Sequence, residues 1–155
     1  MRRQVGLAAF LLLTLGTGLL GRLAVGTSLD TWYRGLAKPP LIPPDWVFAV
    51  VWTVLFILMA VAAWRIWLTL PGPGRRVSLV VFGLQLALNL GWTIIFFGLQ
   101  LPRVALAMLF ALVLAVLADT LLFAQRDRIA ATLMLPYLAW LGFVGYLNLG
   151  IVDLN

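Results

Sequence analysis

Five long apolar stretches, separated by short polar or proline-rich segments, dominate the hydropathy pattern of the chain. They cover about residues 4–26, 46–70, 77–99, 103–123 and 129–150. Each approaches or exceeds the roughly 20 residues that a helix needs to cross a ~30 Å hydrocarbon core. The stretches are continuously apolar and lack the alternation of β-barrel strands. The pattern therefore predicts an all-α integral membrane fold, a five-transmembrane-helix bundle that forms a single domain over residues 1–155.

The first connection, about residues 27–45, is the longest. Residues 32–52, which overlap it, hold four of the eight prolines and three of the seven tryptophans. Proline fixes φ and lacks a backbone donor, so this loop is predicted to be stiff. Long loops in compact proteins are usually functional or disordered. We therefore expect a rigid lid over a binding site.

The composition agrees with a membrane protein and its charge sets a topology. The chain is 64% hydrophobic and only 10% charged, with a mean hydropathy of +1.09, whereas soluble domains carry about a quarter charged residues. The net charge of +6 is concentrated on one side of the bundle, so we attribute it to topology and expect no nucleic-acid partner. In a cytoplasmic membrane, the positive-inside rule places the N-terminus in the cytoplasm and the lid outside. The choice between a cytoplasmic and an outer membrane stays open. The basic residues on the N-terminal side are Arg2, Arg3, Arg75, Arg76, Arg126 and Arg128.

Three residue types are missing from the sequence, and their absence excludes several chemistries. There is no cysteine, no histidine and no glutamate. Disulfides, thiolate catalysis, imidazole catalysis and zinc sites are therefore excluded, and the usual axial ligands of haem iron are missing. We expect no metal site, no required cofactor and no exporter mechanism built on an intramembrane glutamate.

The third apolar stretch has two distinct faces. Gly83, Ala87 and Gly91 recur every four residues, a pattern that lets helix backbones approach closely in lipid. At 100° per residue, the polar and aromatic side chains of this stretch lie on the opposite side, at roughly 180–240° from Gly83. The small face predicts packing either within the monomer or in a homodimer. The amides on the other face either bond neighbouring helices or line a cavity. That face consists of Gln85, Asn89, Trp92 and Phe96.

Two further positions suggest a pocket near the lid. Trp52 lies more than a turn inside the second stretch, where its indole can form the floor for a flat ligand. Arg22, near the outer end of the first stretch, can snorkel, meet an anionic ligand, or pair with Asp30 to brace the lid, which we rank first. A helical stripe in the fifth stretch is typical of core but is also compatible with a pocket wall. Its members are Trp140, Phe143, Val144, Leu147 and Ile151.

Several motifs give the chain a specific resemblance from about residue 5 to its C-terminus. They are Trp32-Tyr33, Leu36, Lys38-Pro39-Pro40, Pro43-Pro44, Trp46-Val47-Phe48, Val51-Trp52, Met59, Gln85-Leu86, Asn89, Trp92, Phe96-Phe97-Gly98, Pro136-Tyr137-Leu138, Trp140 and Leu147-Asn148. With these motifs together, the chain resembles the tryptophan-rich sensory protein/translocator protein (TspO/MBR) family, also described as peripheral benzodiazepine receptor-like.

The resemblance implies a five-helix bundle, commonly dimeric, with a pocket under the first loop. Members bind porphyrins such as protoporphyrin IX, isoquinoline or benzodiazepine drugs and, in animals, cholesterol. By motif, the resemblance places the ligand-binding residues here at Arg22, Ala24, Trp32, Phe48, Ala49, Trp52, Asn89, Val104, Ala107, Ala111, Trp140, Val144 and Leu147. It also implies a homodimer, which we place on the face of Gly83, Ala87 and Gly91, with membrane lipid and a porphyrin or drug-like molecule as the other partners.

The chain departs from the family at three points. Leu41 is aliphatic where many members have an aromatic residue, and Val104 occupies a position that is often Trp in animals. The C-terminal cholesterol pattern of animal members is missing. The lid contacts and drug affinity are therefore expected to differ, and cholesterol is dropped as a specific ligand.

Three functions follow from this reading of the sequence. The first is a membrane receptor or sensor that binds porphyrins and regulates tetrapyrrole or stress responses, with a preference for metal-free porphyrin over haem. The second is light-dependent porphyrin degradation, reported for some bacterial members, in which Trp52 and Trp140 would flank the ligand. The third, ranked last, is a transporter, because no inverted repeat or charged relay is visible.

Overall fold

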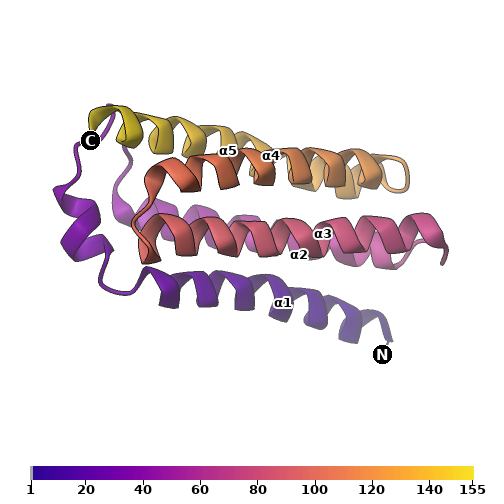
Figure 1. Ribbon diagram of the computed structural model, residues 1–155. Helices are drawn as coiled ribbons and strands as arrows, with labels where there is room; N and C mark the ends of the chain where they lie inside the picture. Colours follow the sequence, from indigo (N-terminus) through magenta and orange to yellow (C-terminus); the bar gives the residue numbers. More distant parts are fainter. Residues whose placement is uncertain (1) are drawn as a thin grey trace.

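The computed structural model describes residues 2–155, which form long helices joined by short connections. Five of the helices, α1 to α5, are long and apolar enough to cross a membrane, and they lie side by side (Figure 1). This confirms the predicted all-α fold class. The elements are α1 (Arg2–Val25), η1 (Leu29–Tyr33), α2 (Asp45–Trp67), α3 (Pro73–Thr93), η2 (Ile94–Gly98), α4 (Pro102–Ala124) and α5 (Arg128–Leu154).

Local sequence signals set the helix ends. The second helix ends at Trp67, short of the expected 70, as the chain approaches Pro71 and Pro73, which cannot continue a helix. Pro73 instead opens α3, as Pro102 opens α4, since a missing N–H is tolerated in the first turn. The side chain of Asp127 accepts hydrogen bonds from the first backbone N–H groups of α5.

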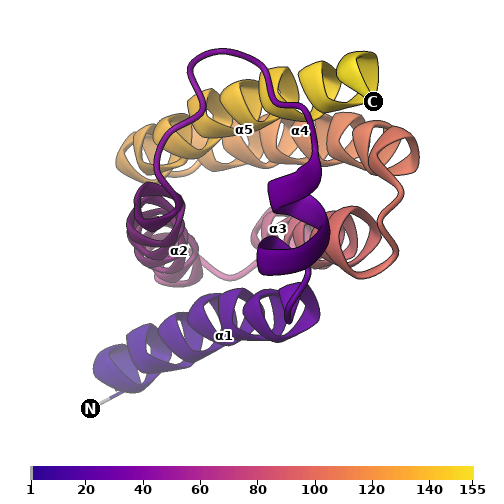
Figure 2. The same ribbon diagram turned by 90° about the vertical axis from the view of Figure 1, so that its left-hand side faces the viewer.

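The helices pack around one shared interior. Helix α4 packs against α3 and α5, α5 also packs against α2, and α1 packs against α2 and α3. Seen end-on, the segment between α1 and α2 crosses the end of the bundle over α3 and α5 (Figure 2). We call residues 26–44 the lid and this end of the molecule the lid end. The opposite end, where α2 meets α3 and α4 meets α5, is the arginine end.

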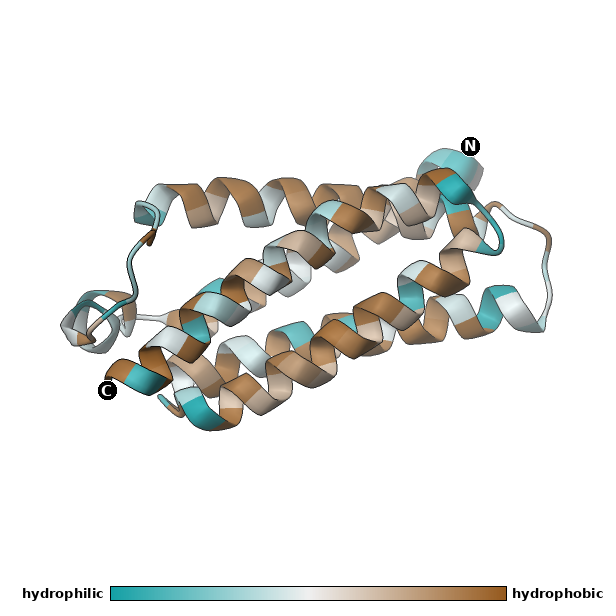
Figure 3. Ribbon diagram, turned by 90° about the horizontal axis from the view of Figure 1, so that it is seen from above, coloured by the Kyte–Doolittle hydropathy of each residue, from teal (hydrophilic) through white to brown (hydrophobic). Residues whose placement is uncertain are grey.

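The outer surface of the bundle suits lipid. Hydrophobic residues extend along the helices, whereas hydrophilic ones gather mainly near the helix ends (Figure 3). Large apolar side chains such as Leu12, Phe110 and Leu121 are exposed. In water such a surface would be unfavourable, but in a bilayer it matches the hydrocarbon. The chain is therefore an integral, multi-pass membrane protein.

Buried polar side chains join the helices to one another. The Asn89 amide of α3 donates to the Tyr137 hydroxyl of α5 at 2.9 Å. The Trp92 indole N–H donates to the Asn148 side-chain oxygen at 3.2 Å, and the Asn148 amide donates to the Pro102 carbonyl at 2.9 Å. The amide of Gln85 contacts the Met59 sulfur at 3.7 Å. The polar face of α3 thus does bond neighbouring helices, one of the two alternatives from the sequence.

Candidate ligand-binding site

A cavity of about 670 Å³ lies beneath the lid. Helices α1, α2, α3 and the C-terminal part of α5 form its walls, and η1 and η2 contribute at the lid end. The volume lies within the roughly 300–1,000 Å³ that is typical of small-molecule pockets. The cavity is therefore large enough for a drug-sized or larger organic ligand.

Aromatic rings dominate the inner wall. Trp52 lies 5.7 Å from Phe56, centroid to centroid, with the two rings inclined by 30°, so they form a stacked pair on α2. Trp92 and Phe96 form a second pair at 5.6 Å on the α3 side. All four side chains line the cavity. Flat, polarisable faces of this kind suit a planar apolar ligand.

A few polar side chains lie among the apolar ones in this wall. Arg22, Asp45 and Asn89 line the cavity, together with Tyr33 from the lid. Burial, with a further contribution from the charge of Asp45, raises the pKa of Tyr33 to about 12, so its hydroxyl stays neutral and can donate a hydrogen bond. Within residues 2–155 no group of three or more acidic, Cys or His side chains could hold a metal ion. The wall thus offers an organic ligand one guanidinium at Arg22, one carboxylate at Asp45, and hydrogen-bonding groups at Tyr33 and Asn89.

The cavity opens along the seam between α1 and α2. Its lining residues Leu19 on α1 and Thr53 on α2 are exposed, whereas Val144 and Leu147 on α5 are each only 4% exposed. The cavity is therefore exposed to the bilayer between these two helices.

The opposite end of the cavity is closed. No lining residue lies deeper than Phe56 on α2 or Asn89 on α3. Beyond them, Ile66, Phe82 and Phe123 fill the interior and are at most 1% exposed. The cavity is a blind pocket and does not continue through the bundle.

The lid is fastened to α5 and to η2. The Tyr146 hydroxyl donates to the Pro40 carbonyl at 2.7 Å, and the Asn155 side chain makes two hydrogen bonds to the backbone of Ala37. On the other side, Trp32 packs edge-on against Phe96 at 5.7 Å. These contacts, together with the prolines, hold the lid over the cavity.

The structure brings seven of the predicted ligand-binding residues together at this cavity. They come from α1, α2, α3 and α5, and they include the floor residue Trp52. The seven are Arg22, Phe48, Ala49, Trp52, Asn89, Val144 and Leu147.

Six other predicted positions do not line it. Trp140 lies behind Trp52, at 6.4 Å and nearly perpendicular, and contacts Phe48, so the two indoles do not flank one space. Trp32 anchors the lid, and the Ala24 carbonyl lies against Gly98. The remaining three, on the outward face of α4, are exposed: Val104, Ala107 and Ala111.

The expected brace between Arg22 and Asp30 is wrong. Asp30 instead pairs with Arg34, one helical turn away, at 2.9 Å. Arg22 lines the cavity and forms no salt bridge within residues 2–155. Its charge is therefore available to an anionic ligand, one of the other roles that the sequence left open for Arg22.

Several lining residues are missing from the predicted set. Trp92 and Phe96 do share the polar-aromatic face of α3, which was the available signal. Tyr33 and Leu29 reach the cavity only because the lid folds back over it. The glycine-rich side of α1 gave no chemical signal, although Gly18 lies so close to the Phe56 ring that a Cβ there would collide with it. The lining residues outside the predicted set include Gly18, Leu29, Tyr33, Phe56, Trp92, Phe96, Asn148 and Ile151.

Fold and cavity together define a class: a five-helix, multi-pass membrane protein with a lidded aromatic pocket at one end. Comparison with known proteins then identifies the family. The TspO/MBR family profile matches residues 9–154, so the chain belongs to the TspO/MBR family.

Named relatives agree with this assignment. The chain is 37% identical to the tryptophan-rich protein TspO of Chlorobaculum tepidum, over 100% of this chain and 99% of the relative. It is 40% identical to the tryptophan-rich sensory protein of Cereibacter sphaeroides, over 81% and 78% of the two chains. It is also 40% identical to the human translocator protein, over 76% and 70%.

Proposed function

We propose that this chain is a membrane receptor or sensor that binds porphyrins of the protoporphyrin IX type, and flat isoquinoline- or benzodiazepine-type molecules, in the cavity beneath the lid. The observation that carries the proposal is the blind, aromatic cavity of about 670 Å³ with a single cationic side chain, Arg22, in its wall. Two relatives are named tryptophan-rich sensory protein and translocator protein, and these names support the general class of membrane receptor or sensor.

The chemistry of a porphyrin matches the wall. Its macrocycle is flat and apolar, so it can stack on the indole of Trp52, which lines the cavity beside Phe56. Its propionates are anionic and can accept charge-assisted hydrogen bonds from Arg22 and a neutral hydrogen bond from Tyr33. Arg34 and Lys38, which were also expected to meet the propionates, are engaged within the lid.

Binding followed by signalling fits this geometry better than passage across the membrane. A transporter needs a site that opens alternately to both sides. Here the cavity ends at Phe56 and Asn89, and the arginine end is filled by buried aromatic and aliphatic side chains. We therefore favour a receptor over a transporter.

The sequence also predicts which porphyrin binds best. Because the chain contains no histidine and no cysteine, it cannot offer the usual axial ligands of haem iron. Metal-free protoporphyrin IX should therefore bind more tightly than haem. Equal or tighter haem binding would contradict the arrangement proposed here.

The test is a titration of purified protein with protoporphyrin IX in the dark, following tryptophan quenching and the Soret band. Trp52→Phe should weaken binding about fivefold, since it replaces the indole with a smaller ring and loses on the order of 1 kcal/mol of stacking. Trp67→Phe is the matched control, because Trp67 lies at the arginine end and should leave the affinity unchanged. Equal affinity in all three proteins would refute the assigned pocket.

We also propose that the chain forms a homodimer through the exposed part of the small face of α3. Gly91 packs against Met108 of α4 within the chain, but Gly83 has open space around it. Ala87, between them, is exposed. Gly83→Leu should convert a detergent-solubilised dimer into a monomer by light-scattering mass, whereas Gly142→Leu, at another open glycine on α5, should not. A monomeric wild type would end this proposal without affecting the pocket.

A further inference from the structure

A second concave surface lies at the arginine end, far from the lid. It is a groove of about 540 Å³ where the α2–α3 connection meets the start of α3. Its lining includes Trp67, Pro71, Arg75, Arg76, Leu79 and Val80. The groove therefore combines two guanidinium groups with an apolar wall.

The first guanidinium is held in place by the backbone. One terminal nitrogen of Arg75 donates to the carbonyls of Trp67 and Thr69, at 3.0 and 3.2 Å. These bonds fix the direction of the side chain without neutralising its charge. The second terminal nitrogen and Nε make no hydrogen bond within residues 2–155, so they remain available to an anion.

The charge of this groove has no counter-charge in the described part of the chain. Two carboxylates lie on this side of the bundle: Asp127 pairs with Arg65 at 2.8 Å, and Asp119 is buried within α4 and forms no salt bridge within residues 2–155. Arg76 is exposed, and neither it nor Arg75 forms a salt bridge within residues 2–155.

The two ends of the molecule differ in charge. Apart from Arg2, the arginine end carries six arginines and one surface aspartate, Asp127; Asp119 is buried within α4. The lid end carries four basic and three acidic residues, and there Arg34 pairs with Asp30. An unbalanced positive charge is thus a property of one end and attracts anions to it.

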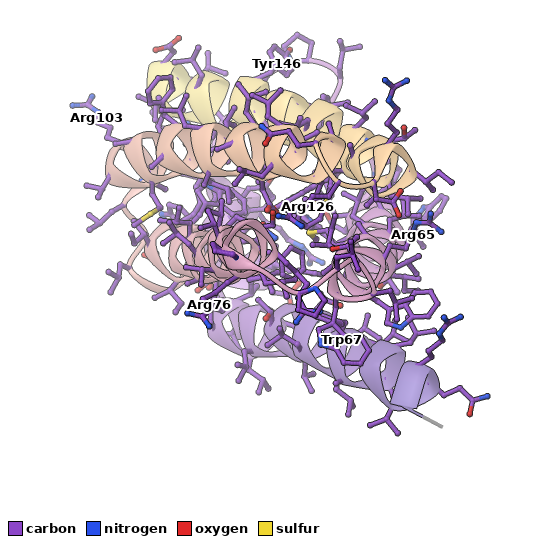
Figure 4. All side chains as sticks on the ribbon, turned by 90° about the vertical axis from the view of Figure 1, so that its right-hand side faces the viewer. Arg65, Trp67, Arg76, Arg103, Arg126 and Tyr146 are labelled. Atoms are coloured by element: carbon purple, nitrogen blue, oxygen red, sulfur yellow. The ribbon has the colours of Figure 1, made fainter. Side chains whose placement is uncertain are left out.

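A third arginine next to the groove, Arg126, packs against Gly74. The guanidinium of Arg126 lies so close to Gly74, the residue before Arg75, that a Cβ at position 74 would collide with it. Figure 4 looks onto this end, with Trp67 and Arg76 toward α1 and Arg126 nearer the middle of the bundle. Cationic side chains therefore surround the start of α3 on more than one side.

The apolar wall points to the source of the anion. Val80 is 64% exposed and follows Arg76 by one turn on the lipid-facing side of α3. Trp67 lies at the end of α2, where indoles mark the interface between water and lipid. A soluble anion would use only the arginines, whereas a lipid would also use the surface below them.

We propose that this groove binds the phosphate headgroup of an anionic phospholipid of the surrounding bilayer, with the start of an acyl chain against Leu79 and Val80. Arg75 and Arg76 supply charge-assisted hydrogen bonds to the phosphate oxygens, and Trp67 packs beside the glycerol region. The site is independent of the porphyrin pocket, which lies at the other end of the helices.

The test is native mass spectrometry of the full chain titrated with phosphatidylglycerol or with phosphatidylcholine carrying the same acyl chains. Wild type should bind phosphatidylglycerol at least tenfold more tightly. Arg76→Ala should reduce this affinity about fivefold, and Arg75→Ala/Arg76→Ala by tenfold or more, because a basic residue that directly contacts an anionic headgroup contributes about a fivefold factor. Arg76→Ala is the safer variant, since Arg75 also ties the end of α2.

Two control variants separate this groove from general basicity. Arg128→Ala removes an exposed arginine from the same end but outside the groove, and Arg103→Ala removes one from the lid end. Both should bind phosphatidylglycerol within twofold of wild type. Equal affinity of wild type for the two lipids, an equal loss in Arg128→Ala, or displacement of the lipid by millimolar inorganic phosphate would each overturn the proposal.

Discussion

The same helices form an open half near the lid and a closed half near the arginine end. Near the lid, α1, α2 and α3 leave a cavity between Trp52, Trp92 and their neighbours. Toward the other end, Phe82 and Phe123 stack at 6.2 Å and, together with Ile66, leave no comparable space in the interior. The contrast indicates a division of roles: the closed half stabilises the bundle, and the open half gives up packing in order to hold a ligand.

The largest predicted effect is on stability in the closed half. Phe123→Ala should reduce the free energy of unfolding by about 3–5 kcal/mol, because it leaves a cavity in a fully buried stack. Phe48→Ala, in the cavity wall, should cost less than half as much, since one side of that ring already faces space. Unfolding in mixed micelles measures both values. Equal losses would mean that the lid end is packed as tightly as the arginine end.

A smaller effect is expected when the lid is released. Tyr146→Phe/Asn155→Ala removes the three hydrogen bonds that join the lid backbone to α5. Each exposed bond contributes about 0.5 kcal/mol, so protoporphyrin IX should dissociate roughly tenfold faster in stopped-flow measurements. Thr132→Ala, which removes a hydroxyl bonded only within its own helix, is the control. An unchanged dissociation rate would show that the ligand leaves through the α1–α2 seam without lid opening.

The smallest effect concerns pH and the arginine end. Although partial burial opposes ionisation of Asp127, hydrogen bonds from Ala130, Arg65 and Ile129 and the charge of Arg65 lower its pKa overall. A depressed folded pKa stabilises the protein above the unfolded value of about 3.9, and this contribution is lost as the pH falls through the folded value.

The corresponding variant is Asp127→Asn, which keeps a capping side chain but loses the ion pair with Arg65. At pH 7 it should reduce the free energy of unfolding by about 1 kcal/mol or less, which is measured as a slightly lower melting temperature. The difference from wild type should shrink as the pH falls below 4. A difference that stays constant down to pH 3 would assign the effect to capping and not to charge.

Much of the fold could be predicted because its signals are local. Runs of about 20 apolar residues identify the helices, and the 100° periodicity of α3 separates its small face from the face with Asn89 and Trp92. The position of Trp52, a turn inside α2, likewise predicted an aromatic floor. These features depend on spacing within one helix.

The rest depends on contacts that no local pattern contains. Helix α4 is apolar on all sides, so its sequence does not say which face turns inward. Packing buries Ala105, Leu109 and Leu112, which leaves Ala107 and Ala111 outside. Tyr33 joins the cavity because Pro40 and Ala37 are fastened to residues more than 100 positions away. Only the folded chain brings these segments together.

The most direct measurement compares two alanine-to-tryptophan variants in the dark protoporphyrin IX titration. Ala49 lines the cavity, whereas Ala111, which the family resemblance also assigned to ligand binding, lies on the outward face of α4. Ala49→Trp should fill the mouth of the cavity and weaken binding at least tenfold, and Ala111→Trp should leave it unchanged. Loss of binding in Ala111→Trp with normal binding in Ala49→Trp would place the porphyrin elsewhere and contradict the account.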